Sequence, residues 1–435
     1  MNILLIEQLK KSSQTSNQFL TRFLTTFSIL PTLYIRRLDA ITPDHHQVTI
    51  LNERYQQRTI SKIYDLVVIH FTTASSNTAY NVADEFKKLN VPVVLCGLHA
   101  SALPDEALNH ADSVLLGRGE CNWLELLNDA EEKNLKKIYP PKPYQTKDCY
   151  IPPTNVSLPG FVLMGAVEAT RGCPYQCRFC PEGNTPYGEK FYTRPVDEVI
   201  DEIKHLPQKI FMFYDMSLTI DPAYTKQLFT KMKALNKRFF CNGNINVLAQ
   251  DPSFVKLSKQ AGCIGWLVGF ESFQQQTLES IGKSTNKVND YKKGVDLIHS
   301  QNMMVIGDFM FGFDTDEPTV FDSTLSMIKK LKIDAADFTI VTPFPGTPLF
   351  NQFQKEGRLL TTNWQKYTMF NPVFQPKQMT PKQLKNGVSK LYKQFYSPKQ
   401  TITRILPSLA RGIYPFFSVA GRNLLASFNA VFLTR

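Results

Sequence analysis

Three cysteines lie close together near the middle of the 435-residue chain, between Thr170 and Pro181. Cys173, Cys177 and Cys180 are four and three positions apart, so one loop can bring all three thiolates to a single metal centre. A 4Fe-4S cluster held by three cysteines leaves one iron free for a further ligand. A structural zinc site usually has four ligands in two separated pairs, and a disulfide would leave one of these cysteines unpaired. The spacing therefore favours an iron–sulfur cluster over zinc or a disulfide.

The other five cysteines are scattered along the chain, which excludes a disulfide scaffold and indicates a reducing, cytoplasmic setting. A hydrophobic content of 43% is ordinary for globular proteins, and the length predicts two or three domains. Residues Met1 to Glu7 do not have the layout of a signal peptide and predict a first strand.

The chain has a formal net charge of +11, and all of the excess positive charge belongs to its C-terminal region. After Glu356 there is no Asp or Glu, whereas residues 357–435 contain twelve Lys or Arg. Apolar residues recur there with helical period, among them Leu424 and Phe432, but twelve residues without a charge are too few to span a bilayer, which needs ~20. Residues 346–435 therefore predict a basic, mainly helical region that either caps the fold or contacts an anionic membrane surface.

Short apolar runs alternate with helical patterns over residues 1–130. A helix is predicted from about Thr78 to Leu89, where apolar residues recur on one face. Strands that alternate with helices form a parallel, doubly wound sheet, which binds ligands beyond the carboxyl ends of its strands. The predicted strands are Asn2–Glu7, Gln47–Asn52, Asp65–His70, Pro92–Cys96 and Ser113–Leu116. Small, polar and Gly-bearing loops that suit a large cofactor follow three of them, at His70–Ser76, Gly97–Ser101 and Gly117–Glu120.

Residues 131–160 are rich in proline and predict an ordered linker. From Phe161 the alternation resumes for about six strand–helix units, which predicts a partial (β/α)6 barrel over residues 161–345. The cysteine loop follows its first strand at the carboxyl end, where the active sites of barrels lie. The predicted strands are Phe161–Ala169, Lys209–Asp215, Arg238–Ile245, Gly265–Gly269, Val305–Phe311 and Asp337–Thr342. The predicted helices are Pro195–Leu206, Pro222–Leu235, Ser253–Gln260, Tyr291–Gln301 and Thr319–Leu331.

These motifs and their order resemble the radical S-adenosylmethionine (SAM) family, in particular its members with an N-terminal cobalamin-binding domain. The CxxxCxxC loop with an aromatic residue before its last cysteine, here Phe179, is typical of the superfamily. The sequence from Leu4 to about Arg404 is similar to anaerobic magnesium-protoporphyrin cyclases and hopanoid-modifying enzymes. The further matching segments are Gly117–Glu120, Gly269–Ser272, Thr342–Pro348 and Phe395–Ser397.

The resemblance implies that the three cysteines bind three irons of the cluster and that SAM chelates the fourth. Cleavage of SAM would then permit hydrogen abstraction from an unactivated carbon inside a barrel that excludes solvent. Asp215 occupies the position of the contact to the amino group of SAM, although the usual Gly-Gly-Glu is absent, and Glu271 that of the ribose contact. Gly269 would admit the adenine, and Phe179 would shield the cluster.

Residues 1–130 resemble the cobalamin-binding domain that precedes many radical SAM barrels. The Asp-x-His-x-x-Gly motif that supplies a histidine to cobalt in other cobalamin proteins is absent, and Asp44-His45-His46 predicts an exposed turn instead. The resemblance therefore implies cobalamin without a histidine ligand to cobalt. The implied contacts are Thr73, Ser75, Gly97, His99, Gly117, Gly119 and Glu120.

The function implied by the resemblance is hydrogen abstraction followed by methyl transfer from cobalamin to a lipid-like or secondary-metabolite substrate. Cyclisation, oxidation or rearrangement without methyl transfer is the alternative. A tRNA methylthiotransferase is a weaker one, because Cys96, Cys121 and Cys149 are not placed to converge on a second cluster. Nucleic acid is not an expected partner, since binding to it would leave the strand–helix units unexplained. The expected electron donor is a flavodoxin- or ferredoxin-type protein.

Overall fold

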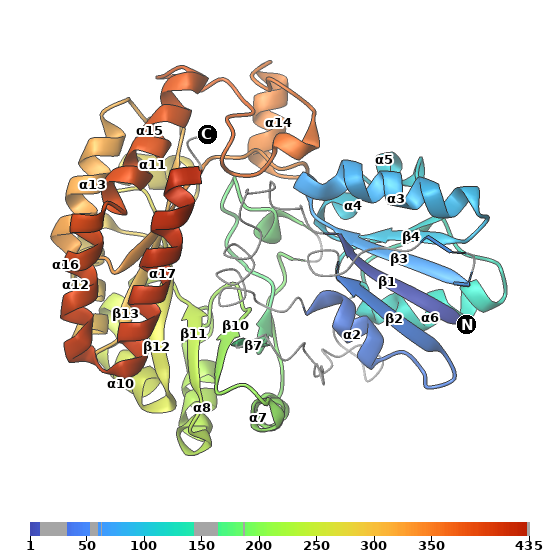
Figure 1. Ribbon diagram of the computed structural model, residues 1–435, viewed down its shortest axis with the longest axis horizontal. Helices are drawn as coiled ribbons and strands as arrows, with labels where there is room; N and C mark the ends of the chain where they lie inside the picture. The colour runs from blue at the N-terminus through green and yellow to red at the C-terminus, as the bar shows by residue number, and fades with distance from the viewer. Residues whose placement is uncertain (9–32, 53–59, 62, 143–163, 186–187, 433–435) are drawn as a thin grey trace.

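The computed structural model describes residues 1–8, 33–52, 60–61, 63–142, 164–185 and 188–432, apart from the side chains of residues 428–432. Two six-stranded sheets dominate it, one formed by the N-terminal part of the chain and one by the middle, and the C-terminal helices pack on the second (Figure 1). The predicted α/β fold with parallel sheets is confirmed.

The first sheet has the strand order β2-β1-β3-β4-β5-β6, and all of its strands are parallel. The order reverses between β1 and β3, and doubly wound sheets bind ligands at the carboxyl side of such a reversal. The five predicted strands are confirmed. The observed bounds are β1 (Asn2–Gln8), β2 (Gln47–Asn52), β3 (Leu66–Phe71), β4 (Val93–Cys96), β5 (Ser113–Leu115) and β6 (Ile138–Tyr139).

This sheet extends further along the chain than the sequence predicts. Ile138 and Tyr139 form β6 and pair with β5, where a linker is predicted. Tyr139 is buried in the apolar layer beneath α6 (Glu120–Glu131), which stabilises an added edge strand. The prediction of a linker from residue 131 is therefore wrong at its start, and residues 143–160 lie outside the described residues.

Helices cover both faces of the first sheet. On one face α3 (Ser76–Lys88), α4 (Leu98–Ala102) and α5 (Pro104–Leu108) bury apolar side chains, and on the other α2 (Tyr34–Ala40) and α6 do so. The predicted helix at 78–89 corresponds to α3. The loop predicted at Gly97–Ser101 is mostly the short helix α4.

The second sheet has the strand order β14-β13-β12-β11-β10-β7, so neighbouring strands follow one another along the chain and all are parallel. Its strands are β7 (Met164–Val167), β10 (Ile210–Phe213), β11 (Arg238–Asn242), β12 (Cys263–Glu271), β13 (Met304–Phe311) and β14 (Ala335–Ile340). The six predicted strands are present, although residues 161–163 lie outside the described residues. The prediction for Arg238–Ile245 is wrong at its end: Ile245 begins the buried helix α9 (Ile245–Gln250), and an apolar run alone does not separate a strand from a buried helix.

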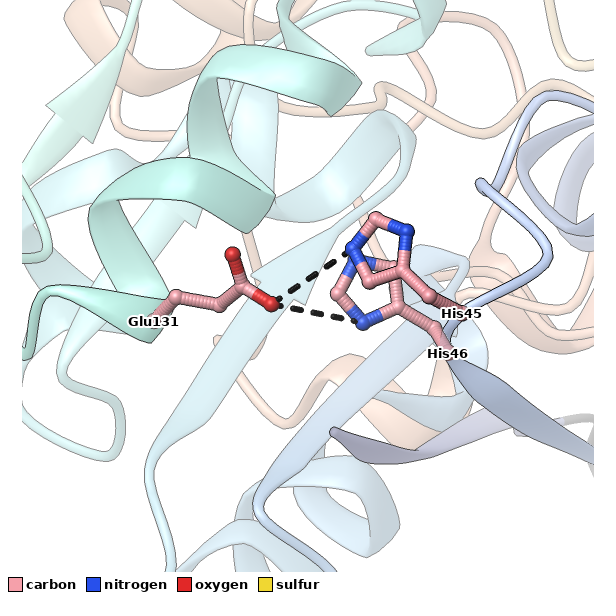
Figure 2. A group of neighbouring side chains, drawn as sticks. All are labelled: His45, His46 and Glu131. Carbon is pink, nitrogen blue, oxygen red and sulfur yellow. Dashed lines mark ion pairs between the residues drawn. The ribbon is translucent and has the colours of Figure 1, made fainter.

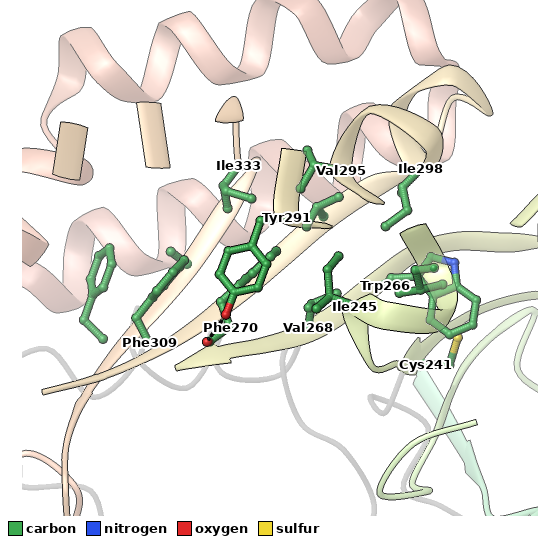
Figure 3. Close-up of a cluster of buried hydrophobic side chains, with 14 of the residues drawn as sticks. Cys241, Ile245, Trp266, Val268, Phe270, Tyr291, Val295, Ile298, Phe309 and Ile333 are labelled. Carbon is green, nitrogen blue, oxygen red and sulfur yellow. Dashed lines mark hydrogen bonds between the residues drawn. The ribbon is translucent and has the colours of Figure 1, made fainter. Parts of the chain in front are cut away.

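One face of the second sheet packs on helices in a large apolar core, part of which is shown in Figure 3. Trp266, Val268 and Phe270 of β12 alternate toward this core. The helices around it include the five predicted ones, observed as α7 (Val196–His205), α8 (Pro222–Met232), α10 (Pro252–Ala261), α12 (Val288–Ser300) and α13 (Val320–Leu331), together with the short α11 (Gln275–Ser280).

The opposite face, called the inner face below, changes character along the strands. Near the amino ends, Met304 and Ile306 of β13 pack with Tyr414 and Val419 of α17 (Ile413–Phe432) in a separate apolar cluster. Toward the carboxyl ends, this face is mostly polar and partly exposed, with Tyr214, Asn242, Asp308, Asp337 and Thr339 beside Gly269 and the apolar Met310. A partly exposed polar wall at the carboxyl ends of parallel strands is where a ligand is expected.

The region after the second sheet is helical, as predicted. It contains α14 (Pro348–Lys355), α15 (Pro381–Phe395), α16 (Pro398–Ser408) and α17. Between α14 and α15, the segment around Trp364 reaches back to the first sheet and contacts the segment Thr73–Ser75.

Candidate active site

The cysteine loop begins just after β7, at the carboxyl edge of the second sheet. Thr170–Arg171 pairs antiparallel with Tyr192–Thr193 and closes the base of the loop. Next to this pair, Gly172 has a φ of 77°, and a Cβ there would lie 1.8 Å from the carbonyl oxygen of Lys190. Only glycine fits at this position, so the glycine of the motif is required by the fold itself.

Contacts from two other segments hold the loop in place. The side-chain amide of Asn184 donates to the carbonyl oxygens of Cys177 and Cys180 at 2.8 and 2.7 Å. The backbone N–H of Arg178 donates to the carbonyl oxygen of Ile281 at 2.9 Å, which docks the segment after α11 against the loop. The loop backbone is therefore positioned by protein contacts alone.

The three sulfur atoms are not gathered at single-ion distances. Within the described part of the chain, Cys173, Cys177 and Cys180 do not form a group whose ligand atoms all lie within 4.8 Å of one another. Burial raises the pKa of Cys177 to about 11 and also raises those of Cys173 and Cys180, so a metal would have to displace protons.

Asp215, just after β10, is completely buried. Its carboxylate accepts hydrogen bonds from the backbone N–H of Ala169 at 3.2 Å and from the hydroxyl of Thr170 at 2.6 Å. Burial raises the pKa of Asp215 to about 7, although these bonds oppose the rise. Asp215 therefore positions the segment that leads into the cysteine loop. Because its carboxylate has no exposed surface, it is not available for the predicted contact with SAM.

Glu271, at the end of β12, is paired with a lysine that no sequence motif marks. Its carboxylate accepts a 2.9 Å hydrogen bond from the ammonium group of Lys283. Burial alone would lower the pKa of Lys283, but Glu271 and the Cys177 thiolate more than offset this and raise it. The amide of Asn286 donates to the carbonyl oxygen of Gly269 at 2.8 Å and fixes the adjacent backbone. Glu271 and Lys283 thus form an ion pair beside the cysteine loop.

Phe179 is partly buried and packs against the apolar core, with its ring centroid 6.3 Å from that of Phe313. Its role as a shield for the cluster stays a prediction.

A buried network of ion pairs joins the two sheets at this edge. Glu168, at the end of β7, is paired with Arg37, Arg118 and Arg171. Burial alone would raise the pKa of Glu168, but the three arginines hold it well below its ordinary value. Arg171, beside the cysteine loop, also pairs with Glu120 of α6 at 2.7 Å, with both side chains 2% exposed. The cysteine loop is therefore held against the carboxyl edge of the first sheet.

Comparison with known proteins agrees with this geometry. Residues 167–328 match the family model described as the radical SAM superfamily, and residues 347–417 match a domain of unknown function. The sequence is 30% identical to a bacteriochlorophyllide d C-12(1)-methyltransferase of Chlorobaculum tepidum, over 83% of this chain and 81% of that protein. The chain belongs to the same radical SAM family.

Other relatives of this radical SAM enzyme include a hopanoid C-2 methylase of Rhodopseudomonas palustris, at 24% identity over 74% of this chain and 64% of that protein. The predicted similarity to anaerobic magnesium-protoporphyrin cyclases is confirmed by one from Cereibacter sphaeroides, at 24% identity over 55% of this chain and 39% of that protein. Among solved structures, the radical SAM methyltransferase TsrM from Kitasatospora setae, with cobalamin and a [4Fe-4S] cluster bound, matches with a TM-score of 0.68 and 14% identity, over 100% of this chain and 99% of that chain. The likeness confirms the α/β fold.

The polar residues predicted to contact cobalamin lie together in this radical SAM enzyme, but they contact one another. The hydroxyl of Ser75 donates to the carbonyl oxygen of Gln8 at 2.9 Å, and Thr73 lies 3.3 Å from Nδ1 of His99. His99 is fully buried, and burial lowers its pKa. The indole N–H of Trp364 donates to Glu106 at 3.0 Å, while Glu106 lies 3.2 Å from Nε2 of His99. These residues brace the carboxyl edge of the first sheet, so any cobalamin contact through them would be made by loops that they position.

The three predicted glycines have positive φ values, as close turns require. Gly97 has a φ of 108°, and a Cβ there would lie 2.3 Å from the carbonyl oxygen of Phe71. The backbone N–H of Gly117 donates to Ser101 at 2.9 Å, and Gly119 precedes α6. Glu120 differs from the prediction. Its carboxylate is buried and paired with Arg171, so it holds the two sheets together instead of lining an open cofactor site.

His45 and His46 form the predicted turn, but only His45 is exposed (Figure 2). Ring nitrogens of the two residues lie 3.7 and 3.8 Å from the same carboxylate oxygen of Glu131, at the end of α6. The exposure predicted for His46 is wrong because the His45 ring lies beside it, with centroids 4.1 Å apart and the rings tilted by 42°, and the turn folds against α6.

Proposed function

We propose that this radical SAM enzyme binds a 4Fe-4S cluster through Cys173, Cys177 and Cys180 and SAM at the open iron, and that it methylates an unactivated carbon with cobalamin held between the two sheets. When bound, these groups supply the radical and the methyl donor. The observation that carries the proposal is the docking of the three-cysteine loop against the loop Gly117–Glu120 of the first sheet by the Glu168 network. In this arrangement both cofactors would share one enclosed space, walled by a partial barrel.

The residues of the chain would position and shield these groups. Asp215 and Asn184 hold the cysteine loop through hydrogen bonds. Glu271, which pairs with Lys283, would accept hydrogen bonds from the ribose hydroxyls of SAM. Lys283 also places a positive charge near the three thiolates and so stabilises the anionic cluster. The buried ion pairs at this edge would help to keep water away from the place where a reactive radical would form.

The substrate that we propose is a large, mainly apolar small molecule, such as a tetrapyrrole or a polycyclic lipid. The relatives are named for methylation of a bacteriochlorophyllide and of hopanoids. The inner face offers partly exposed apolar side chains: Met212 and Leu267 lie nearer the amino ends of the strands than Asp308, and Met310 lies within the polar wall. Relatives named as cyclases support the alternative of cyclisation without methyl transfer. In either reaction a flavodoxin or ferredoxin would supply the electron.

Bacteriochlorophyllide d is the first substrate to test. The protein is reconstituted anaerobically with iron, sulfide and cobalamin and incubated with SAM and a reductant. We expect cobalamin to remain bound after desalting and the product to gain one methyl group by mass. Methyl labelled with deuterium in SAM should appear in the product. Hydrogen abstraction with a mass loss and no label would favour the cyclisation or oxidation alternative, and release of all cobalamin would contradict methyl transfer from cobalamin.

We also propose a peripheral contact between the C-terminal helices and an anionic membrane. In the described part of the chain, each helix is either too short or not apolar enough to cross a bilayer. Exposed apolar side chains recur along α16, the turn after it and the start of α17, and they are Ile402, Leu406, Leu409, Ile413 and Phe417. They lie earlier in the sequence than the predicted face, of which Phe428, Val431 and Phe432 have undescribed side chains. Six of the twelve basic residues are paired within the fold. Arg358 and Lys377 pair with Asp314, and Lys390 pairs with Asp322. Arg404 bonds to Asn423, Arg411 to Asp334 and Arg422 to Asp337.

The membrane proposal predicts that substitution of the exposed apolar residues in α16 and α17 removes vesicle binding. The variant with Leu406→Ser, Ile413→Ser and Phe417→Ser should lose binding to vesicles of anionic phospholipid, because each buried apolar side chain contributes roughly 1.5–3 kcal/mol. Flotation of the full-length chain with these vesicles measures this, and a variant with exposed Leu360→Ser and Met369→Ser is the matched control. Equal flotation of both variants, or binding to nucleic acid alone, would contradict the assignment.

A further inference from the structure

An unpaired carboxyl group lies in the polar wall of the inner face. Asp308 of β13 and Asp337 of β14 are register partners in adjacent parallel strands, which lie roughly 4.8 Å apart, so both side chains project from the same face. Gly269 of β12 is the next partner in this row, and the Glu271–Lys283 ion pair lies over it. The row lies toward the carboxyl ends of the strands, as do Glu271 and the cysteine loop.

The charged residues around Asp308 form two ion pairs, and Asp308 belongs to neither of them. Glu271 pairs with Lys283, and Asp337 pairs with Arg422 of α17. Within the residues that the structure describes, the carboxyl oxygens of Asp308 have no hydrogen bond or ion pair of their own. The side chain is nevertheless partly exposed, so a bound molecule can reach it. A carboxylate in this position would be a second negative charge beside Asp337 and would gain no cation of its own.

We propose that Asp308 is a specificity-determining residue of the proposed active site, which as a neutral carboxylic acid donates a hydrogen bond to a carbonyl or carboxylate oxygen of the substrate. Arg422, whose side chain is 37% exposed beside Asp337, would add a second donor to the same oxygen-bearing group. The apolar residues lower on the inner face would contact the carbon skeleton. The proposal rests on the proposed function, since it places the substrate on the inner face.

The protonation of Asp308 agrees with this geometry. Burial and the neighbouring carboxylate of Asp337 raise its pKa to about 8, with Glu271 acting in the same direction, while Arg422 and Lys283 act against the rise. The group is therefore mainly protonated at neutral pH and ionised above pH 8. An acceptor on the substrate should bind less tightly as the pH rises through this pKa, whereas a cationic substrate group should bind more tightly.

Binding of bacteriochlorophyllide d to the reconstituted holoenzyme, followed by its absorption spectrum between pH 6.5 and 9, tests the proposal. We expect the Kd of the wild type to rise roughly tenfold at pH 9, since about nine-tenths of a group with a pKa of about 8 is then ionised. Asp308→Asn, whose amide remains a donor, should bind within about twofold of the wild type at neutral pH and lose the pH dependence. Asp308→Ala should bind at least tenfold more weakly at neutral pH. Asp296→Asn is the matched control, because Asp296 occupies an exposed position of α12.

Infrared spectroscopy supplies a readout that does not depend on the substrate. At pH 7 the wild type should show a protonated carboxyl band that is missing in Asp308→Asn and disappears from the wild type above pH 9. The difference spectrum is necessary because Asp215 and Asp316 also have pKa values raised to about 7.

Three results would overturn the proposal: no such band at pH 7, tighter binding at high pH, or equal binding by Asp308→Ala. If the wild type also fails to cleave SAM, the proposed function fails as well. Normal SAM cleavage with binding that is insensitive to Asp308 refutes this inference alone.

Discussion

Replacement of Cys173, Cys177 and Cys180 together by alanine should abolish both the iron–sulfur cluster and the cleavage of SAM. The three thiolates come from one loop whose backbone is held by Asn184 and by the segment after α11, and no other cysteine lies in that loop. Iron and acid-labile sulfide should each fall from about four per chain to near zero, because the cluster has no remaining thiolate ligands in the loop. Formation of 5′-deoxyadenosine should fall to the background level.

The matched control for this experiment is Cys263→Ala, since Cys263 is buried in the apolar core and has no place in the loop. It should keep the full iron content. Full iron in the triple variant, or zinc in place of iron in the wild type, would remove the basis of the radical assignment. Circular dichroism of the triple variant checks that the loss is one of metal and not of the fold.

Glu168→Ala should reduce the free energy of unfolding by about 3–5 kcal/mol, because it leaves Arg37, Arg118 and Arg171 buried or half-buried without their shared counter-charge. The same variant should retain cobalamin poorly, since these arginines join the two sheets. Urea unfolding followed by circular dichroism measures the first effect, and cobalamin left after desalting measures the second.

Asp296→Ala, which breaks an exposed ion pair with Lys292, is the control and should lower the free energy of unfolding by no more than about 0.5 kcal/mol.

The pH dependence of stability follows from the depressed pKa of Glu168. Its stabilising effect should be complete above the ordinary glutamate pKa of about 4.3 and should be lost as the pH falls toward the lower folded value. The stabilities of the wild type and Glu168→Gln should therefore converge in acid. A variant as stable as the wild type at neutral pH would show that the network contributes no net stability.

Much of the fold and of the cluster site is readable from the sequence because both depend on neighbouring residues. Strands and helices follow from apolar periodicity over short windows, and the cysteine ligands lie within one loop. The mistakes occur where local pattern and packing disagree. Ile245 continues an apolar run but starts a helix, and Tyr139 joins the first sheet only because the layer beneath α6 buries it.

The sequence by itself therefore determined the parallel α/β architecture, the three-cysteine loop and the family to which the chain belongs. Tertiary structure decided which charged residues meet. Lys283 lies about a hundred positions from the cysteines, yet it reaches them because the segment after α11 docks on the loop. Asp308 and Asp337 become neighbours only through the register of β13 and β14. Glu120 and Asp215 lie in recognisable motifs, but burial commits them to structural partners, because a carboxylate removed from water must find compensating donors within the fold.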